Sequence, residues 1–128
     1  YCAGGSFGGD SSILGAMLGD GDPPAPPRAP TVPTTGYARG APLDDPVAYP
    51  ARHPEILAQF PPTLVIVGTR DFALSGAVAL HSQLVANGVD ARLHVWEGVR
   101  HAFFYDSRMP ESREAYQVMT RFFVERLR

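Results

Sequence analysis

Two short apolar runs in the second half of the chain predict two β-strands. Residues 63–67 form a continuous run of β-branched and apolar side chains, typical of a parallel strand covered on both faces. Residues 91–97 alternate, with Leu93 and Val95 on one side. Residues 72–87 are predicted to form the intervening helix. The order strand–helix–strand therefore predicts a right-handed parallel unit of the α/β class.

Apolar residues at helical spacing indicate which helix faces are buried. On the helix over residues 72–87 we expect burial of Val78, Leu80, Leu84 and Val85. Asn87-Gly88 supplies a left-handed stop to this helix, and Pro110-Glu111 suits the first turn of a last helix. On that last helix we expect burial of Ala115, Val118, Met119, Phe122, Phe123 and Leu127.

The first half of the chain differs sharply in composition. Residues 1–62 hold most of the glycines and nearly all the prolines, which predicts an irregular or extended segment, with one short helix over Ile13 to Leu18. We therefore divide the chain into residues 1–62 and residues 63–128. Tyr1-Cys2 resembles the end of a strand, and two strands make an incomplete sheet. Both features predict a missing N-terminal half, with residues 1–62 following a central strand.

Composition and charge narrow the functional classes. The chain has 128 residues, 45% of them hydrophobic, and a net charge of −2, which argues against a nucleic-acid partner. No apolar run approaches the roughly 20 residues that cross a bilayer. Cys2 is the only cysteine, so no internal disulfide forms, and no signal peptide is visible. We expect a cytoplasmic protein without a membrane span.

An acid and a histidine follow the two predicted strands. Asp71 comes directly after Gly68-Thr69-Arg70, and His101 lies one helix and one strand later. The carboxyl ends of parallel strands meet at one edge, where α/β proteins place catalytic groups. A carboxylate there orients an imidazole for proton transfer. The alternatives are a helix cap for Asp71, which is compatible with catalysis, and a structural histidine for His101. The spacing of the two favours catalysis.

The remaining candidate residues are weaker. His53, His81 and His94 lack ligand spacing, so we expect no metal and no cofactor. Ser6, within Gly4-Gly5-Ser6-Phe7-Gly8, matches the nucleophile pattern Gly-x-Ser-x-Gly. A proline-rich tract follows it, whereas the pattern requires a helix and a further strand. Ser11 is weaker still, because Ile13 occupies the place of a required glycine.

The chain from Asp44 onward resembles the hormone-sensitive-lipase-like α/β-hydrolases, which are mostly bacterial carboxylesterases. The segments that carry the resemblance are Leu43-Asp44-Asp45-Pro46, Pro61 to Asp71, His94 to Gly98, His101-Ala102-Phe103-Phe104 and Pro110 to Tyr116. The resemblance implies the C-terminal portion of an α/β-hydrolase fold, with parallel strands, flanking helices and an incomplete sheet. It implies Asp71 as triad acid and His101 as triad base. Phe72-Ala73-Leu74-Ser75-Gly76 departs from the family's usual Pro-Leu after the acid.

The resulting hypothesis is a serine carboxylesterase acting on short-chain esters. Its serine and oxyanion loop would lie in the missing N-terminal half, which becomes a partner of this chain. Phe72, Leu74 and Phe103 are expected to line the apolar part of the site. The resemblance also implies a homodimer through residues 91–97 and 111–128. The alternative is an inactive fragment that acts only in association with another chain, and a miniature hydrolase using Ser6 is a weaker third hypothesis.

Overall fold

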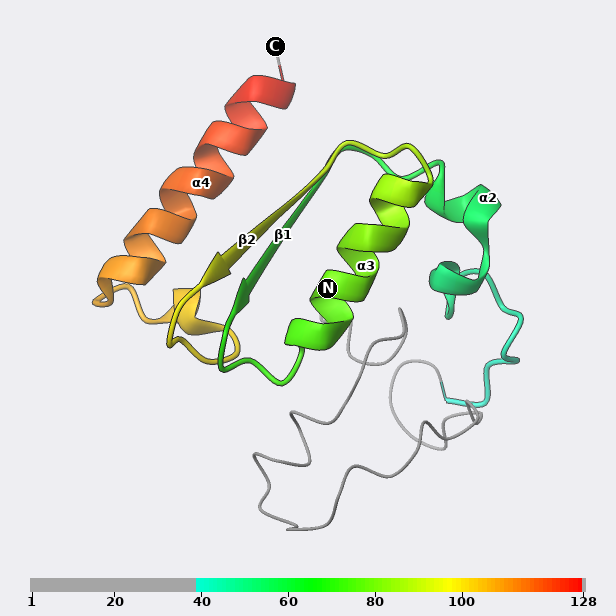
Figure 1. Cartoon of the computed structure of the whole chain (residues 1–128), viewed down its shortest axis with the longest axis horizontal. Helices are drawn as coiled ribbons and strands as arrows, with labels where there is room; N and C mark the ends of the chain where they lie inside the picture. The colour runs from blue at the N-terminus through cyan, green and yellow to red at the C-terminus, as the bar shows by residue number, and fades with distance from the viewer. Residues whose placement is uncertain (1–38, 128) are drawn as a thin grey trace, which may run out of the picture.

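The structure is a computed structural model that describes residues 39–127 (Figure 1). The short helix predicted over Ile13 to Leu18, the strand end at Tyr1-Cys2, and Ser6 and Ser11 lie outside the described residues. The elements follow the order η1 (Pro50–Arg52), α2 (Pro54–Leu57), β1 (Thr63–Gly68), α3 (Leu74–Ala86), β2 (Ala91–Trp96), η2 (Phe103–Tyr105) and α4 (Pro110–Arg126). The two predicted strands and the two predicted long helices are thus confirmed, with bounds shifted by one or two residues.

The strands β1 and β2 pair in parallel, as predicted. Their register runs from Thr63 opposite Ala91 to Gly68 opposite Trp96, and α3 is the crossover between them. Because parallel strands share a direction, the carboxyl ends of β1 and β2 lie at the same edge. In Figure 1 the strand pair runs between α3 and α4.

Each long helix has its own core cluster. Leu84 of α3 packs with Leu57 and Val89, while Ala115 of α4 packs with Val99 and Phe103. The first cluster connects α3 to the 50–60 segment, and the second connects α4 to the segment that follows β2. The site edge of the sheet is therefore supported mainly by α4.

The predicted helix ends are confirmed. Gly88 has φ +80° after the last turn of α3, and α4 begins with Pro110 and Glu111. Glycine is favoured at a left-handed position after a helix, and proline is favoured at the first position of a helix.

The predicted buried faces are partly wrong. Val78 and Val85 of α3, Phe123 of α4, and Leu127, which directly follows α4, are exposed. The burial of Leu84 on α3 and of Ala115 and Phe122 on α4 is confirmed. The other buried residues of these helices were not expected and are small: Gly76 and Ala77 on α3, and Ser112 on α4. Small residues allow a helix to approach the sheet closely, so the larger side chains beside them turn outward.

Phe122 of α4 contacts β2 through the side chain of Arg92. Two guanidinium groups lie over its ring, that of Arg92 at 5.7 Å from the ring centre and that of Arg126 at 5.5 Å. Arg92 also pairs with Glu125 at 2.8 Å, and Arg126 pairs with Asp90. Cation–π contacts add to the burial of the ring, so this side chain contributes to holding the C-terminal half of α4 against β2.

Replacing Phe122 by alanine is therefore expected to lower the free energy of unfolding by about 3 kcal/mol. Phe123→Ala is the matched control, since Phe122 is 5% exposed and Phe123 is 56% exposed. We expect the control to cost under about 1 kcal/mol in urea unfolding. Equal losses in the two variants would contradict this packing of α4.

Candidate active site

The chain that leaves β1 and the chain that leaves β2 run side by side at one edge of the sheet. The Thr69 N–H donates to the Trp96 carbonyl at 2.8 Å, and the Arg70 N–H donates to the Val99 carbonyl at 3.1 Å. Asp71 and His101 follow directly on these two segments. The predicted meeting of the two residues is thus produced by hydrogen bonds that continue beyond the strands.

This close approach requires a glycine at the end of β1. A β-carbon on Gly68 would fall 2.7 Å from Cγ2 of Val99 and closer still to the Val99 carbonyl oxygen. Real β-carbons do not approach other atoms so closely, and here the neighbour is backbone. Gly68 therefore allows the turn that carries His101 to press against β1.

Asp71 is buried and its carboxylate has two partners. The side chain accepts a hydrogen bond from the Ala73 N–H at 2.7 Å and contacts Nδ1 of His101. Only 4% of the residue is exposed. Helix α3 begins later, at Leu74, so the capping role weighed for Asp71 is confined to the turn that precedes the helix.

His101 presents Nδ1 to both carboxylate oxygens of Asp71, at 2.9 and 3.0 Å. A carboxylate only accepts hydrogen bonds, so Nδ1 is the donor to Asp71, and in the neutral imidazole Nε2 is then the nitrogen that can accept a proton. About a third of the imidazole side chain is exposed, against 6% of the Asp71 side chain. An oriented imidazole of this tautomer can accept a proton at Nε2 and return it.

The turn that carries His101 is held by a contact with helix α4 at the residues that follow it. Ala102, the next residue, has φ 56°, a left-handed conformation that is uncommon for alanine. Beyond it, the fully buried Ser112 of α4 donates its hydroxyl to the Phe103 carbonyl at 2.9 Å. Backbone strain beside a chemically competent side chain persists only where surrounding contacts enforce it.

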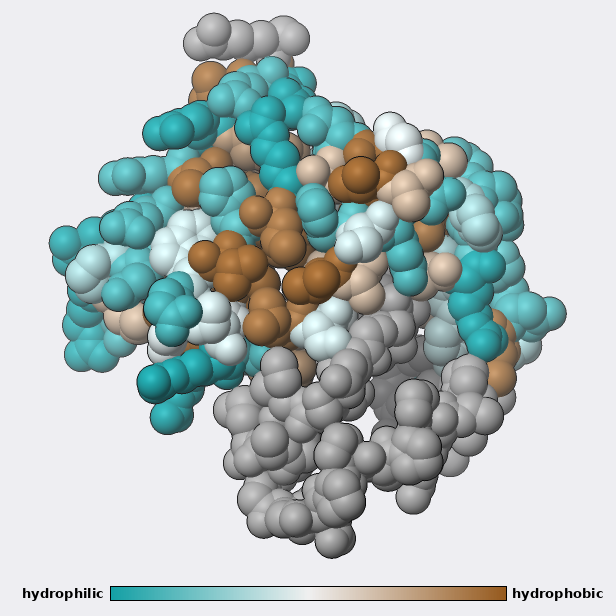
Figure 2. All heavy atoms as spheres, viewed as in Figure 1, coloured by the Kyte–Doolittle hydropathy of each residue, from teal (hydrophilic) through white to brown (hydrophobic). Residues whose placement is uncertain are grey.

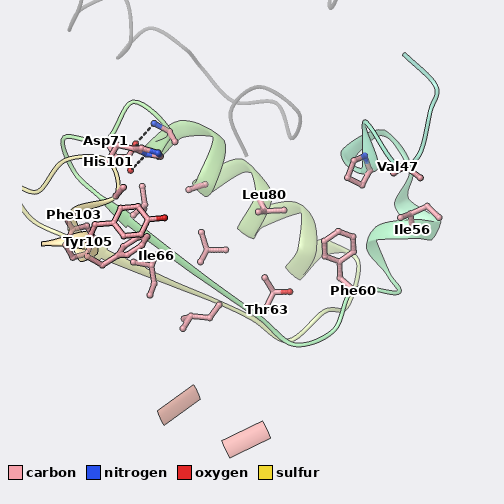
Figure 3. A pocket seen from close by; sticks show the side chains of 18 of the residues that line it. Val47, Ile56, Phe60, Thr63, Ile66, Asp71, Leu80, His101, Phe103 and Tyr105 are labelled. Atoms are coloured by element: carbon pink, nitrogen blue, oxygen red, sulfur yellow. Dashed lines mark hydrogen bonds and ion pairs between the residues drawn. The ribbon is translucent and has the colours of Figure 1, made fainter. Parts of the chain in front are cut away.

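A cavity of about 930 Å³ opens beside this pair. Its described walls are mostly apolar and come from β1, from α3 and from residues 46–60 and 101–105. In Figure 3 Asp71 and His101 lie together at one end, while Val47, Ile56 and Phe60 lie toward the other. Figure 2 shows apolar side chains gathered over the strand pair and α3 on this face. Such a cavity suits a small apolar ligand with one reactive polar group.

The three expected pocket residues take different positions. Phe103 lines the cavity. Phe72 lies against the His101 ring instead, with ring centres 4.4 Å apart, and Leu74 starts α3 and is absent from the described walls. Sequence reasoning missed the contributions of Tyr105 and Pro50, for which neither spacing nor motif gave a signal.

Neither a metal centre nor a membrane-spanning helix is found among the described residues. No group of three or more His, Cys, Asp or Glu within residues 39–127 is placed to hold a metal ion. Among the helices of that range, none is both long and apolar enough to span a membrane. The Asp71–His101 pair, which lies beside the apolar cavity, is the candidate site of this structure.

Comparisons with known proteins agree with this geometry. Residues 20–105 match a family model described as the α/β-hydrolase fold. Over 49 residues the chain is 49% identical to a protein named esterase from Fusarium pseudograminearum (strain CS3096), a match that covers 38% of this chain and 15% of that one. The crystal structure of an esterase named E25 is 38% identical, with a TM-score of 0.60.

The chain is much shorter than these relatives. The match to E25 covers 67% of this chain and 26% of the solved one. The chain thus spans about a quarter of the solved esterase and a smaller share of the Fusarium protein.

Replacing Gly68 by alanine is expected to destabilise the protein by about 1–3 kcal/mol and to displace His101 from Asp71. Gly88→Ala is the control, because Gly88 has a left-handed φ but open space around it. We expect the control to cost about 1 kcal/mol without moving His101. Urea unfolding measures the loss of stability, and the NMR signal of the His101 Nδ1 proton reports whether His101 stays on Asp71. A Gly68→Ala protein that keeps this signal would contradict the close approach.

Proposed function

The chain belongs to the α/β-hydrolase fold family, in its hormone-sensitive-lipase-like group, and we propose that it supplies the acid and the base of a serine carboxylesterase. The observation that carries the proposal is the contact of His101 Nδ1 with both oxygens of the buried Asp71 carboxylate, at the edge of an apolar cavity. Two esterases among the similar proteins support the same reaction class.

In the proposed reaction a serine hydroxyl attacks the ester carbonyl while His101 Nε2 takes its proton. The Asp71 carboxylate holds the Nδ1–H and stabilises the imidazolium that forms. His101 then gives the proton to the departing alcohol. Water attacks the acyl-enzyme in the same manner, with His101 again as base and then as acid. Backbone N–H donors would stabilise the oxyanion.

We place the serine and the oxyanion donors in a segment N-terminal to this chain. Within the described residues the sheet has two strands, so β1 has β2 on one edge and no strand partner on the other. The cavity runs along residues 63–67 of that strand. An open parallel edge beside an apolar hollow is suited to an added strand, which would also cover the strand faces. The added segment would therefore complete both sheet and site.

The substrate is proposed to be a small carboxylic ester. The described cavity walls are mostly apolar, and Phe103 lies among them close to His101. Apolar walls favour the acyl part of an ester, while the reactive carbonyl faces the polar end. The preference for short acyl chains is carried over from the family resemblance.

Asp71→Asn and His101→Ala are each expected to lower kcat for p-nitrophenyl acetate by roughly 10³-fold or more in the protein that contains this chain. Asp71→Asn keeps the shape but weakens the support of the imidazolium. His81→Ala, on the middle of α3, is the matched histidine control and should keep the wild-type rate. Retention of most activity by either site variant would refute the assignment.

The alternative of an inactive fragment is tested with residues 1–128 alone. Because the proposal places the serine elsewhere, the isolated chain should not hydrolyse esters. Adding a separately produced N-terminal segment should restore turnover, whereas a mixture that stays inactive would favour the inactive fragment. Turnover by the isolated chain that Ser6→Ala abolishes would contradict the proposed division of the triad and favour a miniature hydrolase.

A homodimer through the last strand and helix stays a proposal. Val95 of β2, Phe123 of α4, and Leu127, which directly follows α4, are exposed. Sedimentation equilibrium of the protein that contains this chain tests it, and a monomer mass at micromolar concentration would contradict it.

A further inference from the structure

The turn that carries His101 is tied to the end of β1 by the side chain of Thr69. Its hydroxyl Oγ1 accepts a hydrogen bond from the Gly98 N–H at 2.7 Å, across 29 positions of sequence. The backbone N–H of Thr69 donates to the Trp96 carbonyl at 2.8 Å. One residue therefore holds two points at the base of the turn, while Asp71 contacts His101 near its tip.

The conformation of Gly98 explains why its N–H is bonded by the Thr69 side chain and not by the backbone of β1. Its φ of +75° is left-handed, so the chain leaves the strand direction at this residue. The Gly98 N–H then bonds to a hydroxyl and not to a backbone carbonyl of β1. The ladder resumes one residue later, where the Val99 carbonyl accepts from Arg70. Thr69 thus closes the gap in the ladder.

We infer, on the basis of the proposed function, that Thr69 is a positioning residue of the acid–base pair. Its hydroxyl fixes the base of the turn, so that His101 Nδ1 stays on the Asp71 carboxylate. His101 lies three positions after Gly98, and a small rotation at the base moves the imidazole by a larger distance. Misplacement of a catalytic group by about 1 Å can cost about a hundredfold in rate.

Thr69→Val tests this role, since valine keeps the shape and removes the acceptor. We expect kcat for p-nitrophenyl acetate to fall between roughly tenfold and a hundredfold, with KM little changed, because Thr69 acts through His101. Thr69→Ser keeps a hydroxyl and should restore most of the rate. Asn87→Ala is the control: it removes a different hydrogen bond between a side chain and the backbone, in which Asn87 Nδ2 donates to the Gln83 carbonyl at 2.8 Å at the far end of α3.

A second readout does not depend on turnover. In ¹⁵N-labelled protein, the His101 Nδ1 proton should give a downfield NMR signal in the wild type, in Thr69→Ser and in Asn87→Ala. In Thr69→Val this signal should broaden or disappear through exchange with water. The measurement reports the hydrogen bond between His101 and Asp71. General destabilisation of the fold would not remove this one signal selectively.

The outcomes separate the two proposals. A Thr69→Val protein with the wild-type signal and the wild-type kcat overturns the positioning role. So does an equal loss of kcat in Asn87→Ala, which would indicate a general effect of lost stability. If His101→Ala keeps its activity while Thr69→Val loses the proton signal, the esterase proposal fails and the positioning of His101 by Thr69 stands.

Discussion

The absence of a side chain at Gly68 is the constraint on which the candidate site depends. Because no β-carbon is present, the backbone of Val99 reaches the end of β1 and accepts a hydrogen bond from Arg70. That contact sets the path of the chain leaving β2. Asp71 lies three residues after Gly68 and His101 two residues after Val99, so the approach of the backbones brings the two side chains within hydrogen-bond distance.

The described structure combines a firmly held pair with a sparsely covered sheet. Asp71 is buried and bonded, and the His101 turn is held by Thr69 on one side and by Ser112 beyond it. In contrast, most residues of β1 and β2 are only half-buried, although parallel strands are normally covered on both faces. The N-terminal segment that would cover β1 is also the proposed source of the serine. Folding and catalysis would then depend on one adjoining segment.

The sequence allowed the topology and the pair to be predicted, because both depend on chain direction and spacing. A strand, a helix and a parallel strand return the chain to the same edge, which brings Asp71 and His101 near each other. The contact between their side chains depends in addition on the close approach at Gly68. The rotation of the helices was not predictable in the same way. Phe123 is exposed and Phe122 buried because Ser112 and Ala115 set how α4 approaches the sheet, and spacing alone does not rank neighbouring phenylalanines. The contact of Thr69 with Gly98 likewise joins distant residues through a left-handed turn.

The central claim is that His101 and Asp71 activate a serine outside this chain. Covalent labelling with a fluorophosphonate tests it most directly, because this reagent traps the activated serine and peptide mass spectrometry locates it. In the protein that contains the chain, the account predicts one labelled serine outside residues 1–128, with a labelling rate that falls sharply in His101→Ala. A label on Ser6, or a labelling rate indifferent to His101, would contradict the account.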